Sequence, residues 1–192
     1  MTHDGRGEAG PHLTPPAPLT PRDRERFDEC VLPYLDAAYN LARHLLRDAH
    51  EAEEAVQESF LRAIRHFGGF RGVDGRAWIL TIVRNTCFTQ IGRRRSGGEV
   101  VEFDEEAHSL DEAIPGPEAG LVRAMTIESV HAGLGQLPPE FREALMLREL
   151  EGLSYKEIAH VTGVPIGTVM SRLARARKQL LLALGAAAKE GV

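Results

Sequence analysis

Apolar residues recur with the period of an α-helix in two separate parts of this 192-residue chain. In the first part, five of them share one helical face at i, i+4, i+7, i+8 and i+11, namely Val56, Phe60, Ala63, Ile64 and Phe67. After a break at "FGGFRG", the inward-facing residues of a second helix are Trp78, Ile79, Ile82 and Val83. We find no alternating pattern that would indicate a strand. The sequence therefore predicts an all-α fold.

Two small helical domains are expected, because composition interrupts the periodicity. Residues 97–122 hold eight acidic residues and no Lys or Arg, which is typical of an extended linker. Residues 1–22 hold five of the eleven prolines and few apolar residues, so we expect a disordered tail. Its "GRGEAG" matches a dinucleotide-binding pattern by chance, since no strand and helix flank it. The predicted division is a tail (1–22), a first domain (23–96), an acidic flexible linker (97–124), a second domain (125–184) and a C-terminal tail (185–192).

Composition excludes several classes of protein. Apolar residues make up 43% and charged residues 27% of the chain, as in soluble globular proteins. No apolar run suits a membrane helix and no signal peptide begins the chain, so we expect a cytoplasmic protein. Cys30 and Cys87 stand far apart and are expected to be core or half-buried thiols. The histidines lack metal-ligand spacing, and we expect neither a metal site nor a cofactor.

The stretch "LSYKEIAHVTGVPIGTVMSRLARARK" predicts two helices joined by a tight turn. Ser154 and Glu157 have the spacing of a capping box, which begins a helix. Gly163 suits the left-handed conformation that ends one, and Pro165 suits the first turn of the next. This arrangement is that of a helix-turn-helix, whose second helix enters the major groove of DNA.

The second of these helices combines an apolar stripe with a cationic surface. Its inner stripe is expected to be Val169, Leu173, Ala176 and Leu180. From Ile158 to Ala188 there are four basic residues and no acidic one, although the whole chain has a formal charge of −5. Arginine at a groove-facing position forks onto guanine, and other cations neutralise phosphates. The alternative is an amphipathic helix pair with a basic rim.

The first domain carries two further charged surfaces. Five arginines and no acid lie between Gly75 and Gly98, next to aromatic residues that could stack on unpaired bases. Trp78 belongs to the apolar stripe, so a purely structural role is equally open. The preceding helix is acidic from Asp48 to Glu58, which fits either a solvated face or a surface that docks on a basic protein.

Three motifs together resemble the extracytoplasmic-function class of bacterial RNA polymerase sigma factors. They are "EEAVQESFLRAIRHF", "RAWILTIVRNTCF" followed by "RRR", and "LPPEFREALMLRELEGLSYKEIAHVTGVPIGTVMSRLARARK". The resemblance covers about residues 24–182. It implies a non-catalytic subunit that binds core RNA polymerase, recognises promoter DNA and is regulated by an anti-sigma factor. The acidic linker would thread through the polymerase channel used by RNA.

The resemblance also implies roles for individual residues. The residues implied to dock on the clamp of the beta-prime subunit are Glu54, Gln57 and Glu58. Those implied to capture the downstream promoter element, where a base is flipped out, are Phe70, Arg71, Arg84, Asn85, Arg93 and Arg94. Those implied to read the upstream element are Thr168, Met170, Ser171, Arg172, Arg175, Arg177 and Lys178, with Ser171, Arg172 and Arg175 facing the groove. The other face of the second domain would pack on the beta flap.

Three positions depart from the family pattern. Met170 stands where many relatives carry a cation, Ala174 is too small to reach far, and Thr89 replaces a frequent aspartate.

Two other classes of protein fit the sequence less well. A sigma-like adaptor would be expected to carry a receiver domain, and a stand-alone helix-turn-helix regulator would leave the first domain unexplained. An enzyme is excluded most strongly, since no phosphate-binding loop or nucleophile–base pair stands out.

Overall fold

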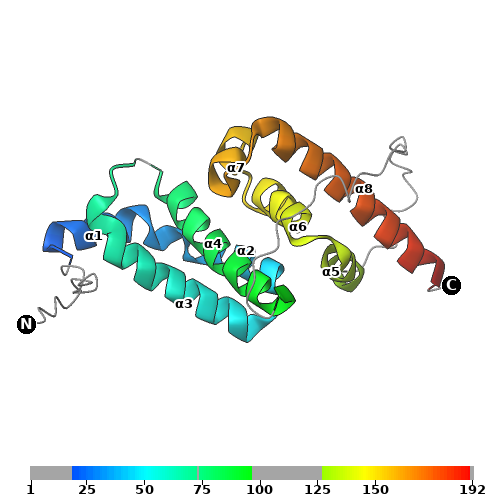
Figure 1. Ribbon diagram of the computed structural model, residues 1–192, viewed down its shortest axis with the longest axis horizontal. Coiled ribbons are helices and arrows are strands. Elements are labelled where there is room, and N and C mark those ends of the chain that lie inside the picture. Colours follow the sequence, from blue (N-terminus) through cyan, green and yellow to red (C-terminus); the bar gives the residue numbers. More distant parts are fainter. Residues whose placement is uncertain (1–18, 73, 97–126, 191–192) are drawn as a thin grey trace, which may run out of the picture.

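The computed structural model describes residues 19–72, 74–96 and 127–190, and within these ranges the chain forms helices and loops without a strand (Figure 1). The first four helices, which we call the first unit, are α1 (Pro21–Cys30), α2 (Leu35–Leu46), α3 (Ala49–His66) and α4 (Gly75–Ser96). The second unit comprises α5 (Ile127–Gln136), α6 (Pro139–Leu145), α7 (Tyr155–Thr162) and α8 (Ile166–Glu190). The predicted all-α class is confirmed for the described ranges. None of the helices there is long and apolar enough to cross a membrane.

The first unit is a bundle in which α2, α3 and α4 pack against one another. The buried face of α3 is made of Ala52, Ala55, Val56, Ser59 and Ala63. The predicted stripe on this helix was wrong at Ile64, whose side chain is exposed. At 100° per residue, Ile64 lies about 80° from Val56 on the side away from Ala52, so it falls outside the buried face.

Short turns complete the two units. Three-residue 3₁₀ turns over Leu32–Tyr34 and Phe67–Gly69 join α1 to α2 and end α3. A π-helical turn over Met146–Leu150 follows α6 and leads the chain toward α7.

Two helices extend past the limits expected from composition. The first begins at Pro21, where the Thr20 hydroxyl accepts a hydrogen bond from the Asp23 amide at 3.1 Å and so caps the helix. The last continues to Glu190, through most of the segment expected to be a C-terminal tail. The expected N-terminal tail lies almost entirely, and the acidic linker entirely, outside the described residues.

The turn between α7 and α8 has the predicted local structure. Both halves of the capping box form, with the Glu157 amide donating to the Ser154 hydroxyl at 3.3 Å and the Ser154 amide donating to the Glu157 carboxylate at 2.7 Å. Gly163 ends α7 with φ of 74°, a left-handed conformation that glycine adopts without strain. Pro165 lies one residue before α8 and accepts from the Val169 amide. The predicted inner stripe is present, with Val169, Leu173 and Ala176 buried and Leu180 partly buried.

The two units pack side by side in this structure. Helix α4 lies against α7, and α2 lies against α6 (Figure 1). The apolar core is continuous between them, with Leu45 and Val83 of the first unit in the same buried cluster as Leu147 and Ile158 of the second. We call this contact between the two units, α4 against α7 and α2 against α6, the seam. The side chains at the seam decide which of the predicted site residues reach solvent.

Candidate nucleic-acid and polymerase interface

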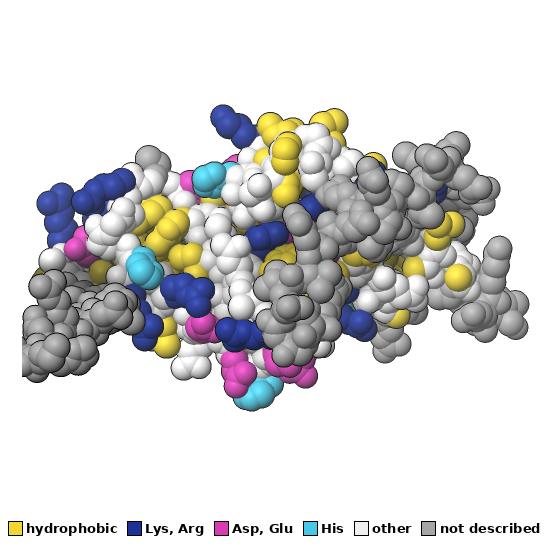
Figure 2. All heavy atoms as spheres, in the orientation of Figure 1, with side chains coloured by type: hydrophobic (Ala, Val, Ile, Leu, Met, Phe, Trp, Pro, Cys, Tyr) yellow, Lys and Arg dark blue, Asp and Glu magenta, His cyan; other side chains and the backbone are white. Residues whose placement is uncertain are grey.

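The exposed surface of α8 holds most of the residues predicted to read the upstream element. Met170 is 53% exposed, and hydrophobic side chains gather over the beginning of this helix in Figure 2. The Ser171 hydroxyl donates to the Thr168 carbonyl at 2.9 Å, so both side chains lie at the same turn. Arg175 is partly exposed, and Arg177 is exposed and donates to the Glu149 carboxylate at 2.7 Å. These residues could approach a DNA groove without repacking the second unit.

Two of the predicted α8 residues are buried here. Arg172 is 7% exposed and Lys178 is 9% exposed, so the expectation that Arg172 faces the groove does not match this conformation. Arg172 lies at the edge of the apolar stripe, about 60° from Val169, where its guanidinium favours the charged form of Glu143. Lys178 lies on the opposite side of α8, and the stripe does not explain its low exposure.

The loop before α4 places its aromatic ring inside the first unit. Phe70 is buried and stacks on Phe67, with ring centroids 5.6 Å apart and planes 27° apart. Its other neighbour is Trp78, at 4.7 Å and 33°. Arg71 is exposed and donates to the Gly68 carbonyl at 3.2 Å. Phe70 thus stacks on Phe67 and packs against the tilted ring of Trp78, so a flipped base would have to add to this aromatic cluster or displace one of its rings.

Two of the predicted cations of α4, Arg84 and Arg94, are engaged by carboxylates. The Arg84 Nε donates to Glu143 at 2.8 Å, its Nη1 donates to the Asn85 side chain at 3.1 Å, and its guanidinium lies 4.4 Å from the centre of the Phe88 ring. Arg94 forms an ion pair with Glu51 of α3, and Arg93 is exposed. The structure therefore brings Arg84 and Asn85 together, while Arg93 and Arg94 lie near the other end of the helix.

The acidic residues of α3 form an outward face. Glu54, Gln57 and Glu58 are all exposed, and their i, i+3, i+4 spacing places them on one side of the helix. Acidic side chains gather along the lower edge of the view in Figure 2, below the basic ones. His50 lies 3.3 Å from the Glu54 carboxylate, and Arg62 pairs with Glu58 at 2.6 Å. Exposed pairs of this kind contribute little to stability, so the face remains available to a basic partner.

A buried carboxylate at the seam is not evident from the sequence. Glu143 of α6 is 0% exposed, and burial raises its pKa to about 7 even though Arg84 and Arg172 favour the charged form. Charge patterning gave no indication of it, because glutamate in "PEFREAL" is most often solvated. Its burial depends on α4, whose Arg84 is 59 positions away along the chain.

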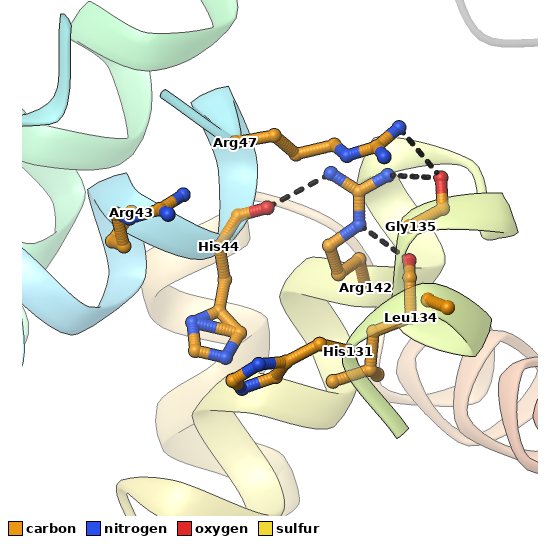
Figure 3. Close-up of a pocket in the computed structure, with 8 residues that line it drawn as sticks. Arg43, His44, Arg47, His131, Leu134, Gly135 and Arg142 are labelled. Carbon is orange, nitrogen blue, oxygen red and sulfur yellow. Dashed lines mark hydrogen bonds between the residues drawn. The ribbon is translucent and has the colours of Figure 1, made fainter. Parts of the chain in front are cut away.

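Arg142 is a second charged residue at the seam that the sequence did not reveal. Its guanidinium donates to the carbonyl of His44 near the end of α2 at 2.8 Å (Figure 3). It also donates to the neighbouring carbonyl of Leu45 at 3.2 Å. It also donates to the carbonyls of Leu134, Gly135 and Leu137 around the end of α5, at 2.8, 3.3 and 2.8 Å. One arginine thus satisfies the last carbonyls of two helices from different units, where a positive charge is also favoured by both helix dipoles.

A cavity of about 370 Å³ beside Arg142 is lined by Arg43, His44, Arg47 and His131, among others (Figure 3). Burial lowers the pKa of His44, and the neighbouring charges of His131, Arg142 and Arg43 lower it further. The donors of Arg142 and one donor of Arg47 are taken by helix-end carbonyls, whose partial negative charge disfavours an anion there. The cavity therefore belongs to the seam and is not a convincing anion site.

Both cysteines are free, as the sequence predicted. Cys30 is half-buried, and Cys87 is buried, which raises its pKa to about 12. A thiol with so high a pKa carries almost no thiolate at neutral pH and is unreactive.

Comparison with known proteins identifies the family. The Sigma-70 region 2 model matches residues 30–97, and the Sigma-70, region 4 model matches residues 127–180. RNA polymerase sigma-H factor of Pseudomonas aeruginosa is 39% identical over 170 residues, which span 84% of this chain and 88% of that protein. The ECF RNA polymerase sigma-E factor of Haemophilus influenzae is 32% identical over 166 residues, or 82% of this chain and 87% of that protein. The chain belongs to the extracytoplasmic-function (ECF) family of sigma factors.

Solved structures support the assignment to the ECF sigma factors. The sigma factor RpoE of Bartonella quintana, solved in complex with the anti-sigma factor NepR, superposes with a TM-score of 0.64 at 28% identity, covering 84% of this chain and 98% of RpoE. CnrH, solved in complex with the cytosolic domain of CnrY, gives a TM-score of 0.57 at 25% identity, covering 85% of this chain and 90% of CnrH. Sigma factors are transcription initiation factors without catalytic activity. The first unit thus corresponds to region 2 and the second to region 4.

Proposed function

We propose that this ECF sigma factor brings core RNA polymerase to its own set of promoters, with region 4 reading the upstream element and region 2 capturing the downstream one. The observation that carries the proposal is the helix-turn-helix of α7 and α8, whose exposed surface offers Ser171, Arg175 and Arg177 beside a buried stripe. Arg175 is assigned to base edges, and Thr168, Arg177 and Lys178 to phosphates. Arg172 and Lys178 reach DNA only if they leave their buried places.

In region 2, the proposed site is the surface around the loop before α4 and the middle of that helix. Arg71 is exposed at the loop, and Arg84 and Asn85 share one turn of α4 with Phe88. A flipped base costs a few kcal/mol of lost stacking, which aromatic stacking and cationic backbone contacts offset. Arg93 and Arg94 would hold the strand farther along α4.

Polymerase is proposed to dock on two surfaces. Glu54, Gln57 and Glu58 of α3 supply a negative face suited to the clamp of the beta-prime subunit, and the outer side of region 4 packs on the beta flap. We further propose that an anti-sigma factor holds the chain off polymerase in the cytoplasm. The support is that RpoE of Bartonella quintana was solved with such a factor bound.

Transcription in vitro with core RNA polymerase and genomic DNA fragments tests the proposal. The wild-type chain should give promoter-dependent transcripts. Replacing Glu54 and Glu58 together with Gln should weaken polymerase binding severalfold. The double replacement of Glu25 and Glu29 with Gln on α1 serves as the charge-matched control at another exposed site. No transcript from any fragment, including after removal of a co-purified inhibitor, would contradict the proposed function.

The role of Arg175 has its own test. Arg175→Ala should relax discrimination at one position of the upstream element by about 1 to 3 kcal/mol, as loss of a bidentate base contact does. Binding to promoters with single substitutions in that element measures it. An equal loss of affinity on every sequence would show that Arg175 contacts only phosphates.

A further inference from the structure

Two arginines of α4 are held by carboxylates of the second unit. Arg84 donates to Glu143 at 2.8 Å, and Arg76 donates to Glu151 at 2.8 Å. The Glu143 side chain is entirely buried, and only 18% of the Arg84 side chain reaches solvent. Arg76 also donates to the backbone carbonyl of Glu151. Both contacts join residues that are far apart in the chain and belong to different units.

Glu143 accepts a hydrogen bond from the Arg84 guanidinium, the group that a DNA strand would need for its phosphate. A carboxylate and a phosphate use the same guanidinium donors in the same planar geometry, so Arg84 cannot serve both through the same N–H groups. The face of Phe88 is likewise covered by the Arg84 guanidinium. In this conformation the Arg84 donor held by Glu143 and the face of Phe88 under the guanidinium are unavailable to a nucleic acid.

Other contacts hold the two units together around this pair. Arg142, the residue next to Glu143, donates across the seam to the carbonyls of His44 and Leu45. Arg47 donates in the opposite direction, to the carbonyl of Gly135 at 3.0 Å. The seam is therefore fastened at the end of α2 and at two points along α4, with Glu143 near its middle.

We propose that Glu143 is an internal competitor for single-stranded DNA on α4, which keeps Arg84 occupied until the two units separate. This inference rests on the proposed function for the identity of the DNA-binding face. The free chain binds a single strand weakly because strand binding must first break a buried pair. Separation of the units exposes Arg84 and Phe88 at the same time.

The test measures binding of the full chain to a short fluorescein-labelled single-stranded DNA of randomised sequence, without polymerase. Glu143→Gln keeps the shape of the side chain and removes its charge. We expect about tenfold tighter binding, because a hydrogen bond to a charged group contributes on the order of 1.5 kcal/mol or more. Glu25→Gln removes the same charge from an exposed position on α1 and controls for the change in net charge.

A second variant and a second readout complete the design. Glu151→Gln should tighten binding in the same direction, which keeps the test valid if Glu143→Gln fails to fold. Adding Arg84→Gln to Glu143→Gln should abolish the gain. Small-angle X-ray scattering of the wild-type chain should show a larger radius of gyration with the DNA bound than without it, because strand binding separates the units.

The outcomes separate this inference from the proposed function. If Glu143→Gln and Glu151→Gln bind DNA no more tightly than Glu25→Gln, Glu143 does not compete with DNA and the inference is overturned. If the gain is present but the wild-type chain supports no transcription, the competition stands and the proposed promoter function fails.

Discussion

At the scale of single residues, close packing allows only glycine at some positions. Gly75 begins α4 where the backbone of α1 passes closest, and a Cβ built there would lie 1.9 Å from the Cys30 carbonyl oxygen. No side chain fits at that distance, so the constraint comes from the crossing of two backbones. Gly68 offers a contrast, since a Cβ there would meet no atom within 4 Å.

Gly75→Ala should therefore lower the free energy of unfolding by about 3 kcal/mol, the upper range for overpacking, because the backbone of α1 has to shift. Urea denaturation measures the change, with Gly68→Ala as the matched control and an expected change below about 1 kcal/mol. Equal effects of the two substitutions would mean that α1 moves aside at little cost.

Met170 is an exposed apolar side chain on α8, the helix that we propose to read the upstream element. Met170→Lys should add one phosphate contact and steepen the dependence of log affinity on log salt concentration by about 1. Promoter binding of the polymerase complex, titrated at several salt concentrations, measures the slope. Met170→Gln, which is polar but uncharged, should leave it unchanged.

At the scale of elements, helix α8 is stabilised by its buried stripe more than by any exposed contact. Leu173 lies in the stripe, and Leu182 lies nine positions later on the exposed side of the same helix. The two leucines share a helix and differ in burial, so they separate packing from helix propensity.

Leu173→Ala should cost about 3 kcal/mol of unfolding free energy, through lost apolar burial and the cavity left behind. Leu182→Ala should cost less than about 0.5 kcal/mol, as surface substitutions do. Thermal or urea denaturation of the two variants decides the point. A comparable loss at Leu182 would indicate that this side chain is covered in solution.

At the scale of the whole molecule, closing the seam places an acidic group in a buried site. The charged and titratable groups that face Glu143 are Arg84 and Cys87 from α4, Arg172 from α8 and Glu140 from α6. Burial dominates over the two arginines and raises the pKa of Glu143 from 4.5 to about 7. Between these values the folded chain binds more protons at this site than the unfolded chain does.

The contribution of Glu143 to stability should consequently fall as pH rises from about 4.5 to about 7, by up to about 3 kcal/mol. The measurement is urea unfolding of the wild-type chain and of Glu143→Gln at pH 5 and pH 8. The lowered pKa of His44 acts in the opposite direction, but it is present in both proteins and cancels in the difference. A difference that does not change with pH would mean that Glu143 reaches water in solution.

The sequence by itself determined the features that depend on neighbours along the chain. Helical period predicted the all-α class, and the capping box, Gly163 and the stripe beginning at Val169 formed as expected. These signals are local, because caps, turns and helical faces are set within a few residues. The motifs around them were sufficient to indicate the sigma-factor family.

Only the tertiary structure decided which charged residues are buried and what they contact. The resemblance of the motifs to the sigma-factor family placed Arg84 on a DNA-binding surface. Its contact with Glu143 could not be predicted in this way, because it joins positions 59 apart and requires both units. Arg142 likewise became recognisable only through its hydrogen bonds across the same seam to His44 and Leu45. The burial of Arg172 and the exposure of Ile64 depended on which side of each helix another element packs against. Periodicity indicates that a helix has a buried face, whereas the exact limits of that face, and the electrostatic environment of a charge within it, depend on what packs against it.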